Sequence, residues 1–238
     1  MTELFDPAPA LGLTRESSNE EICKTAFDFV QQVGYMVIGT TALDGVTLTS
    51  RGLELHRLDD SGLFYLGVAK GKPVYFELLQ HPYLVGTLVR TTVKRLSASV
   101  RISAHVTPVD PREHPALYRR YWELNPGTKA LYRKDLDMFR LFLLDSGDGE
   151  VFHLPEDDEV CRLRFGFGGG KPRPWAFAIT DRCIGCGACA QACMEEVIHP
   201  GEDGRYHIDH FGCLECGRCY FTCPQGAIEG RQMPGAAE

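Results

Sequence analysis

Residues 183–193 read CIGCGACAQAC, and residues 213–224 read CLECGRCYFTCP. Each stretch contains four cysteines with the spacing C-x2-C-x2-C-x3-C, and each cysteine of the second stretch lies thirty residues after its counterpart. The repeat uses eight of the ten cysteines in the chain: Cys183, Cys186, Cys189, Cys193, Cys213, Cys216, Cys219 and Cys223. This doubled spacing decides the fold of the C-terminal part of the molecule.

The doubled pattern resembles the two-cluster bacterial ferredoxins over residues 176 to 232. Both stretches also carry the CxxCGxC core of that family. The resemblance implies two 4Fe–4S clusters, with the fourth cysteine of each motif reaching the cluster of the other motif. One cluster would be held by Cys183, Cys186, Cys189 and Cys223, and the second by Cys213, Cys216, Cys219 and Cys193.

Zinc ligation and disulfide formation are the alternative uses of so many cysteines. A structural zinc ion needs four ligands, usually from two CxxC pairs, so a third cysteine in each motif is poorly explained by zinc. Counting alone leaves disulfides open, although the rest of the chain has the composition of a cytosolic protein. The cluster interpretation therefore rests on the specificity of the doubled motif.

The segment between the two motifs predicts a short hairpin. Residues 194–212 read MEEVIHPGEDGRYHIDHFG, with a turn at Gly201–Gly204 and Tyr206 opening the return strand. Met194 is a departure from the ferredoxin pattern, because the family usually has proline there, as at Pro224. All eight ligands are intact, so the departure concerns local rigidity rather than cluster binding.

Composition bounds the rest of the molecule. A chain of 238 residues with 44% hydrophobic and 10% aromatic residues is long enough for one sizeable domain and a small one. Its net charge of −7 argues against nucleic acid as a partner. There is no apolar run of about 18 residues and no apolar signal core near the N-terminus, so we expect no membrane span and a cytoplasmic location. Low-potential clusters also favour an anaerobic setting.

Short β-rich runs with turn signals between them follow a predicted amphipathic helix over residues 16–33. Six or more antiparallel strands with few helices predict a small β-barrel. The strands are predicted at 35–41, 46–52, 62–69, 83–92 and 96–109, the further helices at 72–82 and 111–124, and a closing hairpin over 137–154 that turns at Ser146–Gly149.

Residues 165–175, FGFGGGKPRPW, mark the clearest domain boundary. Three consecutive glycines and two prolines do not suit a regular element and predict a flexible linker. The alternative is a bare backbone lying against a cofactor, with Lys171 and Arg173 near its phosphate. We therefore expect a barrel over 1–155, a linker over 156–175 and a ferredoxin domain over 176–238.

The order of the predicted strands resembles the split-barrel FMN-binding family that includes pyridoxamine 5'-phosphate oxidase, over about residues 15–155. VTLTSRG at 46–52 is similar to the family's second strand, and GLFYLGVAKGKPVYFELLQHP at 62–82 to its third strand, phosphate-binding turn and following helix. The resemblance implies a mainly β split barrel with peripheral helices, bound FMN and a homodimer. By position it assigns FMN contacts to Ser50, Arg51, Lys70, Gly71 and Lys72.

The chemistry of the AKGK segment agrees with a phosphate site. FMN ends in a dianionic phosphate, which favours convergent basic side chains and turn amides. Lys70 and Lys72 flank a glycine at a predicted strand-to-helix junction, where free N–H groups point outward. The alternative is that two lysines at a turn are only solvated. A second basic group consists of Arg90, Lys94, Arg95 and Arg101. We expect these residues to line the flavin site, to bind an anionic substrate or to form a solvated strand edge.

A flavin joined to two one-electron clusters implies an iron–sulfur flavoprotein oxidoreductase, an FMN-dependent reductase. An external low-potential donor would load the clusters, and electrons would pass to FMN and then to a small-molecule acceptor. One alternative is an electron-transfer module in which FMN relays electrons to or from a partner protein. A second is a haem-related split-barrel protein, for which His105 and His153 are the histidines to consider. The sequence identifies no catalytic acid.

Overall fold

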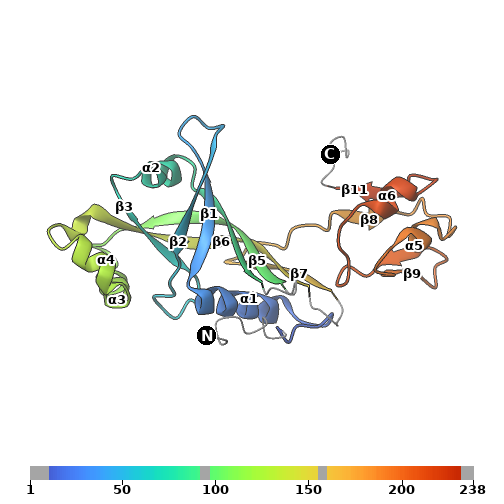
Figure 1. The fold of residues 1–238 in the computed structure, drawn as a ribbon, viewed down its shortest axis with the longest axis horizontal. Coiled ribbons are helices and arrows are strands. Elements are labelled where there is room, and N and C mark those ends of the chain that lie inside the picture. The colour runs from blue at the N-terminus through green and yellow to red at the C-terminus, as the bar shows by residue number, and fades with distance from the viewer. Residues whose placement is uncertain (1–10, 92–96, 155–159, 232–238) are drawn as a thin grey trace.

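The computed structural model describes residues 11–91, 97–154 and 160–231. A β-rich domain formed by the N-terminal part of the chain is joined to a small cysteine-rich domain by an extended connection (Figure 1). This arrangement confirms the expected combination of a mainly β domain with a small α+β domain. Within the described ranges, no helix is both long enough and apolar enough to cross a membrane.

The N-terminal domain begins with helix α1, Asn19–Val33. The Ser18 hydroxyl accepts a hydrogen bond from the Glu21 N–H while the Glu21 carboxylate accepts from the Ser18 N–H, a reciprocal cap that fixes the start of the helix. Gly34 ends it in the left-handed conformation, with φ of 76°. The helix packs Phe27 into the barrel core, against the rings of Phe64, Phe165 and Phe167.

Seven antiparallel strands form the barrel sheet in the order β2-β1-β4-β5-β6-β3, with β7 also paired to β6. Buried aliphatic and aromatic side chains from these strands fill the interior. The strands are β1 Tyr35–Thr41, β2 Leu48–Glu54, β3 Tyr65–Ala69, β4 Tyr83–Thr91, β5 Ser97–Val109, β6 Phe139–Leu154 and β7 Cys161–Phe167.

The predicted hairpin over 137–154 is wrong, because β6 runs through Ser146–Gly149 as one long strand. Its first half pairs with β3 and its second half with β7, while β5 covers the opposite edge. The glycines that suggested a turn are needed for packing. A Cβ on Gly149 would meet the Phe165 ring at 2.3 Å, and one on Gly147 would meet the Ser103 carbonyl oxygen at 2.0 Å.

The predicted linker over 156–175 also needs correction, because residues 161–167 of it form the fully buried strand β7. The glycines that follow fold back over β6 rather than forming a free connection. A Cβ on Gly168 would meet the Asp145 carbonyl oxygen at 1.8 Å, and one on Gly170 that of Gly147 at 2.1 Å. The bare backbone expected in the alternative interpretation therefore exists, but it lies against protein backbone.

Helices cover the outside of the barrel. Helices α2, Pro73–Gln80, and α3, Pro115–Leu124, correspond to predicted ones, whereas α4, Pro126–Leu131, and the 3₁₀ turn Leu136–Met138 were not predicted. Tyr121 and Trp122 of α3 pack against Phe139 of β6 in a second apolar cluster.

The C-terminal domain consists of two similar halves around a small apolar core. The predicted hairpin between the motifs is confirmed, since β9 and β10 pair as neighbouring antiparallel strands. A further pair, β8 with β11, joins the start and end of the domain. Its elements are β8 Phe177–Ile179, α5 Ala188–Ala192, β9 Ile198–Pro200, β10 Tyr206–Ile208, α6 Arg218–Thr222 and β11 Ile228–Gly230.

Candidate functional site

The first cysteine motif and the last cysteine of the second motif line one cavity. Three of these cysteines surround the N-terminus of α5, and the fourth directly follows α6. Ile179 and Ile228 add apolar surface to the same wall. The cysteines of this cavity are Cys183, Cys186, Cys189 and Cys223.

A second cavity is lined by three cysteines of the second motif and the last cysteine of the first motif. Its cysteines are Cys213, Cys216, Cys219 and Cys193. Cys193 follows α5 and reaches this cavity because α5 and α6 pack against each other. The structure thus brings together the two four-cysteine sets named from the sequence. No three His, Cys, Asp or Glu side chains in the described residues are close enough together to hold a single metal ion.

The electrostatics of both cavities suit a cationic iron–sulfur cluster. Burial raises the pKa of Cys219 to about 11, and it also raises the pKa of Cys189 and Cys213. Thiolates in such surroundings need a bound cation as counter-charge. The Glu215 N–H donates to Cys213 Sγ at 3.3 Å, and the Ala227 N–H donates to Cys223 Sγ at the same distance. Hydrogen bonds of this kind to sulfur set cluster potentials.

The two motifs share one backbone path but differ in residue type at two left-handed positions, Gly185 against Glu215 and Glu196 against Gly226. Gly187 and Gly217 begin α5 and α6 with φ of 75° and 76°. Two residues before each, the backbone is again left-handed, with φ of 70° at Gly185 and 53° at Glu215. Glycine adopts this conformation freely, whereas glutamate does so at a cost in strain.

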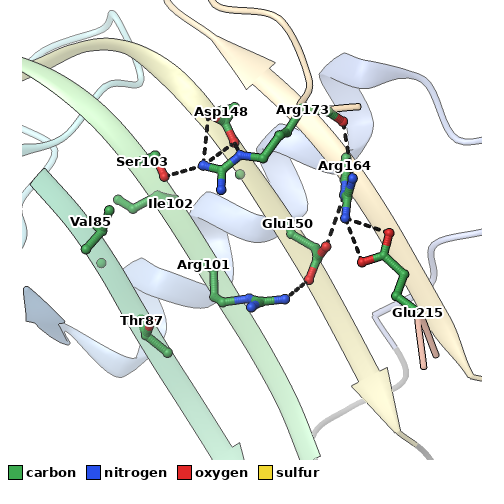
Figure 2. Close-up of a pocket in the computed structure, with 12 residues that line it drawn as sticks. Val85, Thr87, Arg101, Ile102, Ser103, Asp148, Glu150, Arg164, Arg173 and Glu215 are labelled. Atoms are coloured by element: carbon green, nitrogen blue, oxygen red, sulfur yellow. Dashed lines mark hydrogen bonds and ion pairs between the residues drawn. The ribbon is translucent and has the colours of Figure 1, made fainter. Parts of the chain in front are cut away.

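Glu215 is held by arginines of the barrel strand β7. Arg164 Nη2 donates to both carboxylate oxygens of Glu215 at 2.8 Å, and the Ala176 N–H donates to one of them at 2.9 Å (Figure 2). Arg162 Nε donates to the Cys213 carbonyl oxygen at 2.9 Å. The second cysteine loop is therefore bonded directly to the barrel.

The same arginines share a buried carboxylate on β6. Glu150 accepts from Arg162 Nη1 at 2.8 Å and from Arg164 Nε at 3.1 Å. Burial alone would raise the pKa of Glu150, but Arg162 and the hydrogen bond from Arg101 hold that pKa below its usual value. The sequence signal for this network is the alternation of arginines in the otherwise apolar CRLRFGF strand, which sequence reasoning missed.

A third cavity of about 230 Å³ opens beside this network. Figure 2 shows it between β4, β5 and β6, with Arg173 and Glu215 at one side. Arg173, which the sequence placed near a cofactor phosphate, donates to Asp148 and to the Ser103 hydroxyl. Arg101 donates to Glu150.

The lysines assigned to the FMN phosphate lie where β3 leads into α2. Lys70 is half-buried, Gly71 and Lys72 are exposed, and Lys72 occupies the N-cap position of the helix. Its side chain makes no capping hydrogen bond. Space remains around Gly71, since a Cβ there would meet nothing within 4 Å. This arrangement presents two ammonium groups, which suit a phosphate. The expected free N–H groups are mostly occupied, because Pro73 has none, the Lys70 and Lys72 N–H groups donate to Met138 and Ala69, and the Tyr75 N–H donates to the Lys72 carbonyl oxygen.

The remaining assigned residues, Ser50 and Arg51, lie on β2. Ser50 is exposed, whereas Arg51 donates to the hydroxyls of Thr40 and Thr49 and pairs with Glu77 of α2 at 3.0 Å. Burial opposes ionisation of Glu77, yet its pKa is lowered because both threonines donate to it and Arg51 lies beside it. Arg51 thus anchors α2, and sequence reasoning had not identified its partner.

The other basic and histidine positions are dispersed. Arg101 lines the third cavity and Arg90 is half-buried on β4, while Lys94 and Arg95 lie outside the described residues. His105 Nδ1 lies 2.8 Å from an Asp145 carboxylate oxygen. His153 is half-buried near the end of β6.

Comparison with known proteins agrees with the two cysteine cavities. The 4Fe-4S dicluster domain family matches residues 182–227. The C-terminal domain belongs to this ferredoxin family. It is 44% identical over 55 residues to a 7Fe ferredoxin of Hydrogenibacillus schlegelii, covering 22% of this chain and 69% of the relative. A ferredoxin of Alicyclobacillus acidocaldarius is 43% identical over 54 residues, covering 22% of this chain and 68% of that protein.

Solved structures resemble the barrel in fold alone. A haem-binding protein from Mycobacterium smegmatis has a TM-score of 0.50 at 11% identity, covering 83% of this chain and 90% of that one. A pyridoxamine 5'-phosphate oxidase-related FMN-binding protein from Nostoc punctiforme has a TM-score of 0.42 at 12% identity, covering 65% of this chain and 98% of that one. The chain thus combines a split-barrel domain with a ferredoxin domain, as the sequence predicted.

Proposed function

We propose that this protein is an iron–sulfur flavoprotein oxidoreductase. The two crossed cysteine cavities carry the proposal, because each gathers four thiols around one space. Each would hold one 4Fe–4S cluster, which supplies one-electron chemistry when bound. The N–H groups of Glu215 and Ala227 orient two of the sulfurs.

The barrel would bind FMN through the junction of β3 and α2. The ammonium groups of Lys70 and Lys72 offer charge-assisted donors to the phosphate. Arg51 would act chiefly by holding α2 in place through Glu77, with Ser50 exposed beside it on β2. The direct contact between Glu215 and Arg164 supports electron exchange between the two domains, from an external low-potential donor towards a small-molecule acceptor.

The metal and flavin contents of anaerobically purified protein test this function. We expect about eight irons and eight acid-labile sulfides per chain and one FMN. Replacing Lys70 and Lys72 by alanine should weaken FMN binding by roughly 1.5–3 kcal/mol for each lost contact. Full flavin affinity in the double variant would place the phosphate elsewhere, and stoichiometric zinc without sulfide would end the cluster proposal.

An exposed apolar face supports a homodimer. Tyr35 and Val37 of β1 and Val85 and Val89 of β4 are each about half exposed on neighbouring paired strands. A patch of this kind marks an interaction surface. We expect Val37→Asp with Val89→Asp to lower the mass measured by light scattering to that of a monomer. Val46→Asp, at an even more exposed site between β1 and β2, is the control.

Two other functions remain as alternatives. In a relay module, FMN would pass electrons to or from a partner protein. The likeness to a haem-binding protein favours a haem-related role. His105 is the more exposed of the two histidines considered, and it lies beside Asp145. Haem titration followed by absorbance separates this function from the flavin proposal, since His105→Ala would abolish a haem spectrum and leave FMN binding unchanged.

A further inference from the structure

The cavity between the barrel sheet and the second cysteine loop is separate from the two cysteine cavities and from the junction of β3 and α2, and it shares Val85 with the proposed dimer face. Its volume of about 230 Å³ is slightly below the usual range of ligand pockets, about 300–1,000 Å³, and therefore restricts the occupant to a small molecule. Val85 lies opposite Ser103 across the β4–β5 ladder, and Thr87 lies opposite Arg101. The small side chains of Val85, Thr87 and Ser103 therefore form a low floor on the outward face of the sheet, which suits a flat molecule.

Two arginines stand at the edge of this floor. The side chains of Arg101 and Arg173 are 56% and 51% exposed, whereas their partners Glu150 and Asp148 are only 10% and 19% exposed. The cavity therefore presents guanidinium groups to solvent and keeps the carboxylates beneath them. Arg101 donates through Nη2, and Arg173 donates through Nε and Nη2. Among the described residues, Nη1 of either arginine has no acceptor, so it can donate to a bound anion.

Glu215 forms a wall common to this cavity and to the second cysteine cavity. The corresponding residue of the first motif, Gly185, lines neither of them. Glu215 keeps a left-handed backbone that glycine would adopt without strain, with φ of 53°. Its bonds to Arg164 and to the Ala176 N–H give a physical reason for a glutamate at this position.

We propose that this pocket binds a small, flat redox molecule that carries an anionic group. In this arrangement the second cysteine loop, rather than the first, lies against the bound molecule, and Glu215 is its positioning residue. The inference rests on the proposed function for the redox role of the cysteine sites. FMN and a free acceptor share the required chemistry, and the competition experiment below separates these two sources.

Binding of anthraquinone-2-sulfonate tests the pocket directly. Titration calorimetry on the oxidised full chain should show at least about tenfold tighter binding of this anion than of neutral 2-(hydroxymethyl)anthraquinone. Arg101→Gln and Arg173→Gln should each weaken anion binding by at least about tenfold. Arg112→Gln, which removes an exposed arginine paired with Asp110, should leave it unchanged. Equal affinity in all variants would overturn the pocket.

Competition identifies the source of the natural ligand. If FMN displaces the sulfonate and riboflavin does so weakly, the pocket takes the flavin; if FMN and the sulfonate bind together, it takes a free acceptor. Iron, sulfide and flavin contents are measured on the same samples. If the iron, sulfide and flavin contents are complete and the affinity for the anion is unchanged in both arginine variants, the pocket alone is refuted. If iron is missing, the proposed function is refuted.

The role of Glu215 is tested by restoring the glycine of the first motif. Glu215→Gly should keep its iron, because Gly185 serves the same backbone position. When chemically reduced protein is mixed with saturating anthraquinone-2-sulfonate, the variant should lose the fast phase of reoxidation. Glu196→Gly is the matched control, since Glu196 is also left-handed, with φ of 55°, but exposed. An unchanged fast phase in Glu215→Gly would show that the second loop does not face the ligand.

Discussion

The two cysteine loops have the same spacing and the same backbone path, yet they have different neighbours. The first, residues 183–189, is surrounded only by the small domain, and its cavity is lined by residues of that domain. The second, residues 213–219, is bonded to Arg162 and Arg164 of the barrel. One motif repeated in sequence has therefore become two sites with different surroundings.

One exchange within the repeat, Gly185 against Glu215, contributes to this difference, together with the hydrogen bond from Arg162 to the Cys213 carbonyl oxygen. Gly185 satisfies the left-handed turn without strain, whereas Glu215 accepts strain and gains a buried carboxylate facing two arginines. Strain of this kind costs on the order of 1–3 kcal/mol and persists where the surroundings compensate for it. The comparison teaches that the same spacing groups both sets of four cysteines, while contacts outside the cysteines, those of the Glu215 carboxylate among them, join the second loop to the barrel.

The strongest test of the comparison removes the cysteines that cross between the halves. Cys193→Ser should damage the site of the second motif, and Cys223→Ser the site of the first, because each reaches the opposite cavity. Iron content should fall from about eight to about four per chain in either variant. Electron paramagnetic resonance identifies the cluster that remains in each variant. If Cys193→Ser loses the cluster of the first motif, or Cys223→Ser that of the second, the crossed arrangement is contradicted.

The sequence predicted what depends on local spacing. The cysteine sets, the hairpin at Gly201–Gly204 and helix α1 all follow from short-range patterns, and the structure shows the hairpin and the helix near their predicted bounds. Only the grouping around the cavities, and not cluster binding itself, is visible in the structure. The phosphate assignment to Lys70 and Lys72 likewise stays a prediction.

What the sequence did not reveal depends on distant contacts. Gly147 and Gly149 resemble turn residues until the rings of Phe165 and Phe167 are seen packed against them. Strand β7 was not predicted, because the glycines that follow it suggested a linker. These glycines are required because the backbone there lies close to that of β6. The pairing of Glu150 and Glu215 with Arg162 and Arg164 joins residues up to 65 positions apart, and no short-range pattern predicts it.

The next largest effect concerns the bond between the second loop and the barrel. Glu215→Gln keeps the shape of the side chain but leaves the two buried arginines with one carboxylate, Glu150, in place of two, which costs at most about 3–5 kcal/mol. We expect a lower free energy of unfolding in denaturant titration and faster proteolysis between the domains. Glu196→Gln, at the exposed left-handed position, should change neither; equal behaviour of the two variants would mean that the network adds nothing.

A smaller effect should appear on acidification. The pKa of Glu150 in the folded protein is lowered, so its contribution to stability is present above the unfolded value of about 4.3 and is lost as pH falls through the folded pKa. The stability that Glu150 gives to the barrel should therefore be constant from pH 7 to about pH 5 and fall below about pH 4. Unfolding curves of Glu150→Gln should lose this dependence; an identical acid profile would assign it to other carboxylates.

The smallest effect is expected from a substitution that makes the two loops more alike, the replacement of Met194 by proline, as at Pro224. Cys193 has φ of −76° and ψ of 120°, close to the −68° and 113° of Cys223, which precedes Pro224. A residue before proline favours this extended ψ, so the first motif already has the backbone that a following proline requires. Met194 is exposed, and among the described residues its N–H makes no backbone hydrogen bond that proline would remove.

Met194→Pro should therefore stabilise the folded protein by about 0.4–1 kcal/mol, because proline restricts the unfolded chain without straining the native one. Thermal unfolding of the cluster-loaded protein measures the gain, with iron content as the check that all ligands stay in place. Met194→Ala is the control, since it removes the same side chain and leaves the backbone free. If the proline and alanine variants unfold at the same temperature, the backbone of the first loop differs from that of the second, and the likeness between the two halves ends at their cysteines.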